Sequence, residues 1–377
     1  MDSNFKKQTS LLNKVKKVSQ ISGSSPPEIF VGKWNYPNIY TGILSPQEHG
    51  NTNLMSSPEL WHKNKLQIPQ ILNLRKQLIY GRKQNHIKSL EKTFLPILQE
   101  VAMTHKSVST EFTLKKPISP NQEHDSRVPL ISRAGEIEKA ILTENPKIKK
   151  KVDYLTSDIH TKSAPAILEL DKSNISTESI IKILSAGLLG LKKNRKLVPT
   201  RWSITAVDDT LSKSKLERIR FFPQIQSYQV FSSEYLGNHY EFLLLPSPWS
   251  FEVLELSMSN FKMWHDYEGF FPRKKYADSV TGAYYANRLA LTEHLEKIQK
   301  QSSCIVFREV RPEYYAPLGV GILRQTSREA FQNKPNSFDS LQQALADIQS
   351  RLRTPIKYFT DKSILLNSEK QTSLSNF

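Results

Sequence analysis

Apolar residues recur at helical spacing in four stretches of the chain. These stretches are residues 69–81, 176–196, 282–300 and 337–353. In the third, Leu291, Leu295 and Ile298 fall on one side of a helix with 3.6 residues per turn. A further helix is expected over residues 87–105, broken at Pro96, because proline removes a backbone hydrogen bond and clashes with the preceding turn. The pattern therefore predicts amphipathic helices along much of the chain.

The residues at the ends of these stretches predict where the helices begin and stop. Gly81 is expected to end the first helix, since glycine commonly follows the last helical turn. Ser176 is expected to cap the second, and Ser337 or Asp339 the last, because short polar side chains accept hydrogen bonds from free backbone N–H groups.

Short apolar or alternating runs between turn residues predict β-strands. They cover residues 28–32, 108–116, 227–231, 239–245, 249–256 and 303–310. The turn Gly237-Asn238 is expected to join two of them as a hairpin. Because helices and strands alternate without one regular order, the predicted fold class is α+β, with a mixed α/β arrangement left open.

The chain is long enough for two domains or for one large domain with extensions. The pattern of apolar and polar residues changes near residues 190–198, where a helical pattern is followed by a region rich in strand signals. We expect a flexible basic arm over residues 1–20, α/β parts over 21–195 and 196–355 that are closely packed, and a flexible tail over 356–377. The arm carries five lysines and one aspartate.

The charge of the chain is strongly basic. Lysine and arginine outnumber aspartate and glutamate by 53 to 36, which gives a formal net charge of +17. A polyanion, most often a nucleic acid, is the natural partner of such a surface. A general contribution to solubility stays open as the alternative.

Cys304 is the only cysteine of the chain, which excludes an intramolecular disulfide and a cysteine-rich zinc site. No zinc is expected, and a cytoplasmic location is predicted. No run of about 18 apolar residues predicts a membrane span, and residues 1–17 lack the apolar core of a secretory signal. The phosphate-binding patterns G-x-G-x-x-G and G-x-x-x-x-G-K-[ST] are also absent.

Five carboxylates are candidates for catalysis. Asp208 and Asp209 follow a strand-like run, where adjacent carboxylates can hold Mg²⁺. Asp266 and Glu268 share one face if their segment is extended, and Glu309 ends a predicted strand. Assembled, these groups would predict a metal-dependent nuclease or a nucleotide pocket. The alternative is that they cap helices and form ion pairs, and the sequence favours that structural role.

Two basic segments are candidates for contact with nucleic acid. Lys192, Lys193, Arg195 and Lys196 follow the predicted helix over 176–196, where cations also suit a helix C-terminus. Arg201 stands beside Trp202, a pairing suited to a phosphate and a stacked base. Tyr284, Tyr285 and Arg288 lie in the predicted helix 282–300, where core and rim positions are expected and an aromatic patch facing DNA stays open.

Several longer stretches are specific enough to indicate a family. They are "SPPEIFVGKWNYPNIYTGILSP" and "RKLVPTRWSITAVDDTLSK", followed by "GNHYEFLLLPSPWSFEVLEL", "TGAYYANRLALTEHLEK" and "REVRPEYYAPLGVG". Together they resemble the Nre family of archaeal DNA repair proteins, of the NreA type, over most of residues 22–331. The resemblance implies a role in DNA damage repair and binding to the sliding clamp PCNA through a short C-terminal peptide. Many similar proteins carry a cysteine-rich N-terminus, which this chain lacks.

The last seven residues, QTSLSNF, fit most of the clamp-binding pattern Q-x-x-h-x-x-a-a that the resemblance implies. Gln371 takes the first position, Leu374 the aliphatic position and Phe377 the first aromatic position, and no residue takes the second aromatic position. In a 3₁₀ turn Leu374 and Phe377 would form one apolar plug, since residues three apart eclipse. Burying two such anchors gives about 1.5–3 kcal/mol each, which does not cover the cost of ordering seven residues at about 1–2 kcal/mol per residue. Backbone hydrogen bonds or contacts of the folded body with the clamp must contribute, and we expect micromolar binding of the peptide, about −8 kcal/mol. Residues 8–14, QTSLLNK, lack the aromatic and are not expected to bind.

The function predicted from these features is DNA damage repair by a basic body that binds DNA and is recruited to PCNA through residues 371–377. A nucleoid-associated place in the cytoplasm follows from that role. A Mg²⁺-dependent nuclease or nucleotide-processing enzyme centred on Asp208 and Asp209 is the first alternative. A non-catalytic RNA-binding protein is the second.

Overall fold

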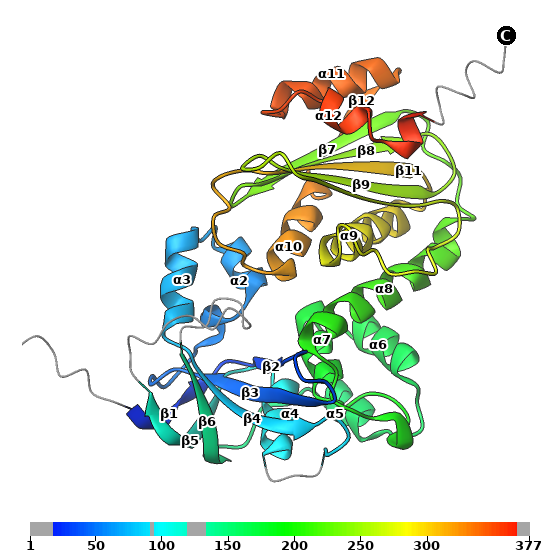
Figure 1. Ribbon diagram of the computed structural model, residues 1–377. Helices are drawn as coiled ribbons and strands as arrows, with labels where there is room; N and C mark the ends of the chain where they lie inside the picture. Colours follow the sequence, from blue (N-terminus) through cyan, green and yellow to red (C-terminus); the bar gives the residue numbers. More distant parts are fainter. Residues whose placement is uncertain (1–17, 91–93, 119–132, 368–377) are drawn as a thin grey trace, which may run out of the picture. The chain divides into compact units, whose positions relative to one another are not determined.

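The computed structural model describes residues 18–90, 94–118 and 133–367 (Figure 1). The chain divides into two compact units, each built from three segments. The first unit takes residues 1–57, 69–161 and 182–200, and the second takes 58–68, 162–181 and 201–377. Both units combine helices with a sheet, so the α+β class is confirmed. The chain passes from the first unit to the second between residues 200 and 201, close to the boundary expected near 190–198. Its other passages between the two units were not predicted from the sequence.

The first unit contains a six-stranded sheet in the order β1-β5-β6-β4-β3-β2. The strands are β1 (Val18–Ser25), β2 (Ile29–Val31), β3 (Asn38–Ser45), β4 (Ile79–His86), β5 (Val108–Ile118) and β6 (Arg133–Leu142). Strands β4 and β6 pair in parallel, and the other neighbours are antiparallel. Helix α4 (Leu95–Met103) lies against this sheet, and its Leu95, Leu98 and Val101 are fully buried.

Two helices predicted for this region are shorter than expected. Helix α3 (Ile68–Lys76) stops early because Ile79–His86 joins the sheet as β4. Gly81 lies inside that strand, where a Cβ atom would come within 2.8 Å of Ile137 and Phe112, so it permits close packing and does not end a helix. Helix α4 begins only at Leu95, with Pro96 in its first turn, where proline is tolerated.

Helix α7 (Thr177–Ser185) also stops before the predicted end at residue 196. The chain turns at Gly187, which has a φ of +75° and where a Cβ atom would meet the backbone of Lys196 at 2.8 Å. Two helices that the pattern did not predict precede it along the chain, α5 (Lys150–Ser157) and α6 (Ser163–Lys172).

The second unit is built on a six-stranded sheet in the order β10-β9-β11-β8-β7-β12. Its strands are β7 (Tyr228–Tyr235), β8 (Asn238–Leu245), β9 (Ser250–Ser257), β10 (Met263–Glu268), β11 (Ser303–Val310) and β12 (Asn336–Phe338). Only β9 and β11 pair in parallel among these neighbours. The turn between β7 and β8 is Leu236–Gly237, one residue earlier than expected. Both residues have positive φ, which suits a two-residue hairpin.

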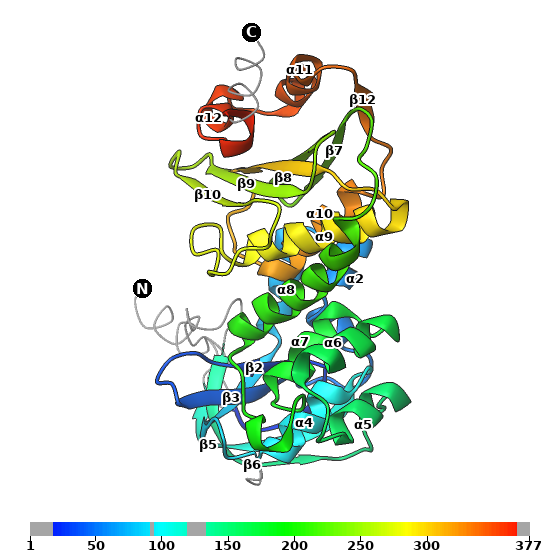
Figure 2. The ribbon, with the colours of Figure 1, turned by 90° about the vertical axis from the view of Figure 1, so that its right-hand side faces the viewer.

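Helices cover both faces of this second sheet. Helices α8 (Thr200–Ile219), α9 (Gly282–Ile298) and α10 (Val320–Ala330) lie on one face, and α11 (Leu341–Arg351) and α12 (Lys357–Thr360) lie on the other (Figure 2). Every residue of the central strand β8 is buried, as expected of a strand covered on both sides. Helix α2 (Pro58–Lys63) adds to this unit through the hydrogen bond from the Tyr235 hydroxyl to the Trp61 carbonyl.

The chain beyond Pro355, expected to be a tail, packs onto the second sheet as far as residue 367. Phe359 and Leu366 belong to the core between the sheet and α11, and buried Glu252 accepts hydrogen bonds from the Ser363 hydroxyl and the Ile364 amide. Helix α11 begins at Leu341 with Ser340 as its cap, not Ser337 or Asp339. None of the helices in the described ranges has the length and hydropathy needed to cross a membrane.

Candidate nucleic-acid interface

Asp208 and Asp209 lie inside helix α8 and not at the end of a strand. The β-branched run before them forms the first turns of the helix, whose buried side includes Val207 and Leu211. Neighbouring residues of a helix point in different directions, so the two carboxylates meet different cations. Asp208 accepts two hydrogen bonds from buried Arg324, at 3.0 and 2.7 Å. Asp209 pairs with Lys213 at 2.7 Å and with Arg288.

Asp266 and Glu268 do share one face of β10, as their spacing predicts, and both are buried. Asp266 accepts hydrogen bonds from the Arg273 guanidinium and from the Val280 backbone N–H, each at 2.7 Å. Glu268 accepts one from Arg288 at 2.7 Å and one from the Arg273 backbone N–H at 3.1 Å. The two carboxylates therefore hold the middle of the segment that connects β10 to α9, at Arg273, and its C-terminal end, at Val280. This segment, residues 269–281, is here called the β10–α9 loop.

Arg288 joins this cluster to helix α8. Its buried guanidinium donates to Glu268, to Asp209 and, at 3.2 Å, to the Ser212 hydroxyl. Burial alone would lower the pKa of Arg288, but the negative charges of Glu268 and Asp209 outweigh it, so the pKa is raised. Three of the candidate carboxylates are thus brought together, but around guanidinium groups that neutralise them. Their contacts support the structural alternative.

The segment held by these contacts presents aromatic and basic side chains to solvent. The exposed fractions are 74% for Phe271, 41% for Phe270 and 46% for Tyr276, and Lys274 and Lys275 are exposed between them. Phe221, just after α8, is 87% exposed. We call residues 220–222 and 270–276 the aromatic–basic surface. Large apolar side chains gathered on a surface commonly mark an interaction site.

Arg220 holds the two parts of this surface together. Its guanidinium carbon lies 5.7 Å from the ring centroid of Phe270 and 5.6 Å from that of Phe271, both within cation–π range. The two rings meet edge to face with centroids 5.2 Å apart. On the other side, Gln301 donates hydrogen bonds to the carbonyls of Arg220 and Phe222. The contacts of Arg220 and Gln301 therefore hold the exposed rings of Phe270 and Phe271 in place.

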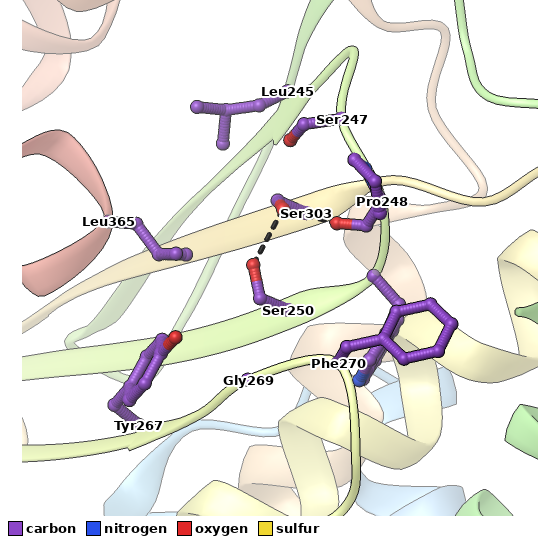
Figure 3. Close-up of a pocket in the computed structure, with 10 residues that line it drawn as sticks. Leu245, Ser247, Pro248, Ser250, Tyr267, Gly269, Phe270, Ser303 and Leu365 are labelled. Carbon is purple, nitrogen blue, oxygen red and sulfur yellow. Dashed lines mark hydrogen bonds between the residues drawn. The ribbon is translucent and has the colours of Figure 1, made fainter. Parts of the chain in front are cut away.

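Phe270 also lines a pocket at the end of the second sheet (Figure 3). This surface was not predicted from the sequence. A signal was nonetheless present, because the tripeptide Phe-Phe-Pro occurs twice, at 221–223 and 270–272, each time beside arginine or lysine. An arrangement of exposed rings and cations can stack on nucleobases and pair with phosphates.

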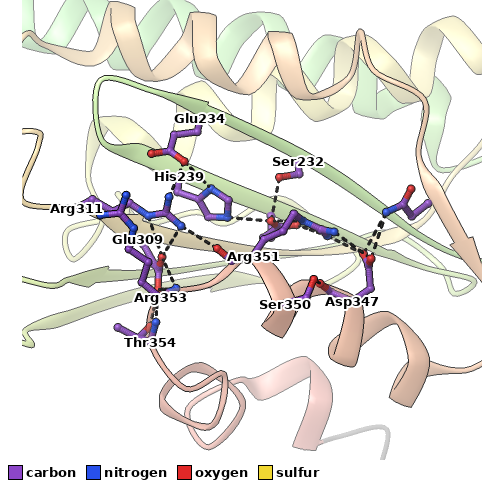
Figure 4. Close-up of polar contacts among 12 residues, drawn as sticks. Ser232, Glu234, His239, Glu309, Arg311, Asp347, Ser350, Arg351, Arg353 and Thr354 are labelled. Atoms are coloured by element: carbon purple, nitrogen blue, oxygen red, sulfur yellow. Dashed lines mark hydrogen bonds and ion pairs between the residues drawn. The ribbon is translucent and has the colours of Figure 1, made fainter.

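Glu309 belongs to a different cluster, on the side of the sheet that carries α11 (Figure 4). It is the last residue but one of β11, close to the strand end where it was predicted. It accepts hydrogen bonds from Arg311, from the backbone of Arg353 and Thr354, and from the Thr354 hydroxyl. It shares none of these partners with the other four carboxylates. Among the described residues, no group of three or more His, Cys, Asp or Glu side chains is placed to hold a metal ion.

The predicted basic segment 192–196 does not end a helix. Lys192 and Lys193 lie in a short 3₁₀ turn and, like Lys196, have exposed side chains. Arg195 instead donates to three backbone carbonyls, those of Gly190, Thr156 and Asp158, at 2.9, 2.7 and 2.5 Å. Its guanidinium ties the turn to the end of α5. Arg201 and Trp202 lie exposed in the first turn of α8, in the second unit.

Two family models match most of the chain. A family model described as archaeal Nre, N-terminal, matches residues 2–264, and one described as archaeal Nre, C-terminal, matches residues 268–377. The chain therefore belongs to the archaeal Nre family, which confirms the resemblance seen in its motifs.

Named relatives cover nearly the whole chain. It is 33% identical over 366 residues to the DNA repair protein NreB of Archaeoglobus fulgidus, covering 95% of this chain and 92% of that protein. It is 33% identical over 376 residues to the DNA repair protein NreA of the same organism, covering 97% and 92%. It is 30% identical over 372 residues to the DNA repair protein NreA of Haloferax volcanii, covering 94% and 88%. No solved structure matches the chain.

Proposed function

We propose that this chain is a DNA repair protein that binds unpaired DNA on the aromatic–basic surface and is recruited to the sliding clamp PCNA through residues 371–377. Its membership of the Nre family, whose named relatives are DNA repair proteins, supports the repair role. The observation that carries DNA binding is the pair Phe270 and Phe271, exposed beside Arg220 and followed by Lys274 and Lys275.

The chemistry of the surface favours unpaired DNA over a perfect duplex. Exposed phenylalanine rings stack on nucleobases, and a base offers its face only where it is not already stacked in a helix. Lysine ammonium groups contact phosphates as point charges without reading sequence. Phe271 and Phe221 supply rings, and Lys274 and Lys275 supply charge. Binding is therefore expected to depend on salt and to be tolerant of sequence.

The proposed clamp contact lies outside the described residues and rests on the sequence pattern of Gln371, Leu374 and Phe377. The structure adds a limit on its reach. Leu366 is buried in the second unit, and the described chain extends to Asn367. Covalent geometry allows at most about 3.3–3.6 Å per residue, so Gln371 stays within about 14 Å of Asn367. Such a short link would hold the clamp beside the second unit and raise the effective concentration of the peptide.

DNA binding is tested with the double variant Lys274→Ala and Lys275→Ala. Its affinity for a fluorescent 20-nucleotide single strand is measured by anisotropy at several salt concentrations. Loss of two phosphate contacts should weaken binding and reduce the slope of log K against log salt by about 1.4. The matched control is Lys362→Ala, another exposed lysine of the second unit. Equal slopes for the two variants would refute this surface as the DNA site.

The clamp contact is tested by gel filtration of the chain with PCNA. Removal of residues 371–377 and the single change Phe377→Ala should each abolish co-elution, because the aromatic anchor contributes about half of the apolar burial of the peptide. The control is Leu11→Ala, in the segment QTSLLNK that lacks the aromatic. Full co-elution of both tail variants would refute the clamp proposal without affecting DNA binding.

RNA binding is the second candidate, because the surface carries no feature that reads the sugar. The same labelled strand is competed with unlabelled DNA and RNA of equal sequence at equal salt. We expect DNA to compete at least as well as RNA. A large advantage for RNA would replace the DNA proposal. The nuclease alternative gains no support from the contacts of Asp208 and Asp209, since arginine and lysine occupy both carboxylates.

A further inference from the structure

A pocket of about 300 Å³ lies where strands β8, β9, β10 and β11 of the second unit end or begin (Figure 3). The end of β8, the turn to β9, the first residue of β11 and the start of the β10–α9 loop form its walls, and Leu365 closes one side. This volume is at the lower end of the range for small-molecule pockets. A single ring system fits a pocket of this size.

The lining of the pocket combines aromatic rings with hydroxyl groups and contains no charged side chain. Tyr267, Trp249 and Phe270 supply the rings, while Ser247, Ser250 and Ser303 supply hydroxyls. In the view of Figure 3, Ser250 and Ser303 lie between Tyr267 and Ser247. A phosphate or another anion would find no cation in this lining. The chemistry favours a neutral, flat ring with hydrogen-bonding groups at its edge.

Two polar groups of the lining lack partners. The Ser303 hydroxyl donates to the Pro248 carbonyl at 2.7 Å and is 2.6 Å from the Ser250 hydroxyl, so those two are engaged. The Ser247 hydroxyl and the Trp249 indole N–H are buried and have no hydrogen-bond partner among the described residues. Burying such a group unpaired costs about 1–3 kcal/mol. Both atoms have almost no accessible surface, so they are shielded from the pocket and do not select its ligand.

The pocket is continuous with the aromatic–basic surface. Phe270 belongs to both, since its ring contacts Arg220 and also lines the pocket. Gln301 provides a second link, because its side chain accepts a hydrogen bond from the Trp249 backbone N–H and donates to the Phe222 carbonyl. A DNA strand lying across Phe270 and Phe271 would therefore pass the pocket opening.

We infer that the pocket receives one unstacked nucleobase of the DNA bound on the aromatic–basic surface. The inference rests on the proposed DNA binding and adds the kind of substrate. A base leaves the stack at a cost of a few kcal/mol, least where it is unpaired or mismatched. The pocket would therefore direct the protein to DNA in which at least one base lacks a partner.

The test compares two duplexes of 20 base pairs that differ by one bulged nucleotide. Anisotropy titrations at equal salt should show the wild-type protein binding the bulged duplex about tenfold more tightly than the fully paired one. Ser247→Phe places a ring in the pocket and should reduce that ratio to about one. The matched control Ser259→Phe makes the same change at an exposed position between β9 and β10 and should keep the ratio.

A second readout does not depend on any variant. A 5-iodouracil placed at the bulge should cross-link under light to the lining residues 247–250, 267–270 or 303, as mapped by mass spectrometry. Cross-links elsewhere, or equal affinity of the wild-type protein for the two duplexes, would overturn the inference. The inference would also be overturned if the Ser247→Phe protein had an unchanged melting temperature and still preferred the bulged duplex. If that variant does not fold, the Ser247→Leu variant and the cross-link decide.

The two proposals fail separately. Equal affinity for the two duplexes would refute the base pocket but would leave the proposed DNA binding in place. Absence of binding to either duplex removes the proposed DNA binding, and the base pocket with it. The Lys274→Ala and Lys275→Ala protein should bind both duplexes more weakly by the same factor, since those lysines contact phosphates and not the displaced base.

Discussion

Glu268 and Arg288 form an ion pair of 2.7 Å in which both side chains are completely buried. Glu268 is the last residue of β10, and the next residues begin the β10–α9 loop that carries Phe270 and Phe271. The ion pair therefore connects the start of the β10–α9 loop, which carries the aromatic–basic surface, to helix α9. Two buried charges are stable together only when their hydrogen bonds are satisfied, and removal of Glu268 takes away one of the two carboxylates that compensate Arg288.

Glu268→Gln should lower the free energy of unfolding by about 3–5 kcal/mol, because Arg288 loses one of its two carboxylates inside the core. Urea unfolding followed by circular dichroism measures the change. The matched control is Glu313→Gln, since Glu313 pairs with Arg353 in an exposed ion pair. An exposed pair contributes less than about 1 kcal/mol. Equal stability of the two variants would show that Asp209 alone holds Arg288.

Phe271→Ala should weaken binding of single-stranded DNA without destabilising the fold. Stacking on an aromatic side chain is worth about 1–3 kcal/mol per base, or a factor of about 5–150 in affinity. Phe271 is largely exposed, so little core packing is lost. Phe261→Ala is the control, because Phe261 is also exposed (61%) but lies between β9 and β10, outside the aromatic–basic surface. Equal affinity of both variants would mean that Phe271 does not touch DNA.

His294 should make the stability of the protein depend on pH between about 4 and 6.5. Burial lowers the pKa of His294 from 6.5 to about 4, with a smaller effect from Lys297, and its ring stacks on Phe331. Above pH 6.5 the histidine is neutral in both states and has no effect. As the pH falls, the unfolded chain binds a proton that the folded chain does not, so stability falls by about 2–3 kcal/mol towards pH 4.

The measurement for His294 is the melting temperature at several pH values from 4 to 8. His294→Leu removes the titrating group and should flatten the curve between pH 6.5 and 4. The control is His160→Leu, which changes a histidine with an exposed side chain. A slope that is unchanged in the His294 variant would assign the pH dependence to other groups.

The fold was predictable where local pattern and packing agree. Strands β8, β9 and β11 are apolar runs bounded by turn residues, and they lie close to the predicted ranges. The run before Asp208 is equally β-branched but forms a helix, because Val207 and Leu211 pack into the core from α8. Local propensity is a weak prior that such packing overrides. Strand β6 is rich in charged residues and had no strand signal at all.

The candidate site was only partly predictable, because its partners are distant in sequence. The spacing of Asp266 and Glu268 correctly places them on one face of β10. Their guanidinium partners, and the contact between Arg324 and Asp208 across 116 positions, depend on tertiary folding. The two Phe-Phe-Pro segments likewise meet only because α8 ends beside the β10–α9 loop. Phenylalanine in a sequence indicates a core more often than a surface.

Glu309→Gln should destabilise the second unit at neutral pH and reduce its sensitivity to acid. Burial alone would raise the pKa of Glu309, but hydrogen bonds from Thr354, Arg353 and Arg311 outweigh it and the pKa is lowered. The carboxylate therefore stabilises the folded state above the ordinary pKa of about 4.3. That stabilisation is lost as the pH falls through the lower folded value, since the folded state then has to bind the proton.

The expected loss for Glu309→Gln at pH 7 is about 1.5–3 kcal/mol, the value of hydrogen bonds to a charged group. Urea unfolding at pH 7 and at pH 3 measures it, and the difference between wild type and variant should shrink at the lower pH. Glu138→Gln is the control, because Glu138 is an exposed glutamate of β6. A difference that stays constant from pH 7 to pH 3 would show that the shape of the side chain, and not its charge, holds Arg311 and Thr354 in place.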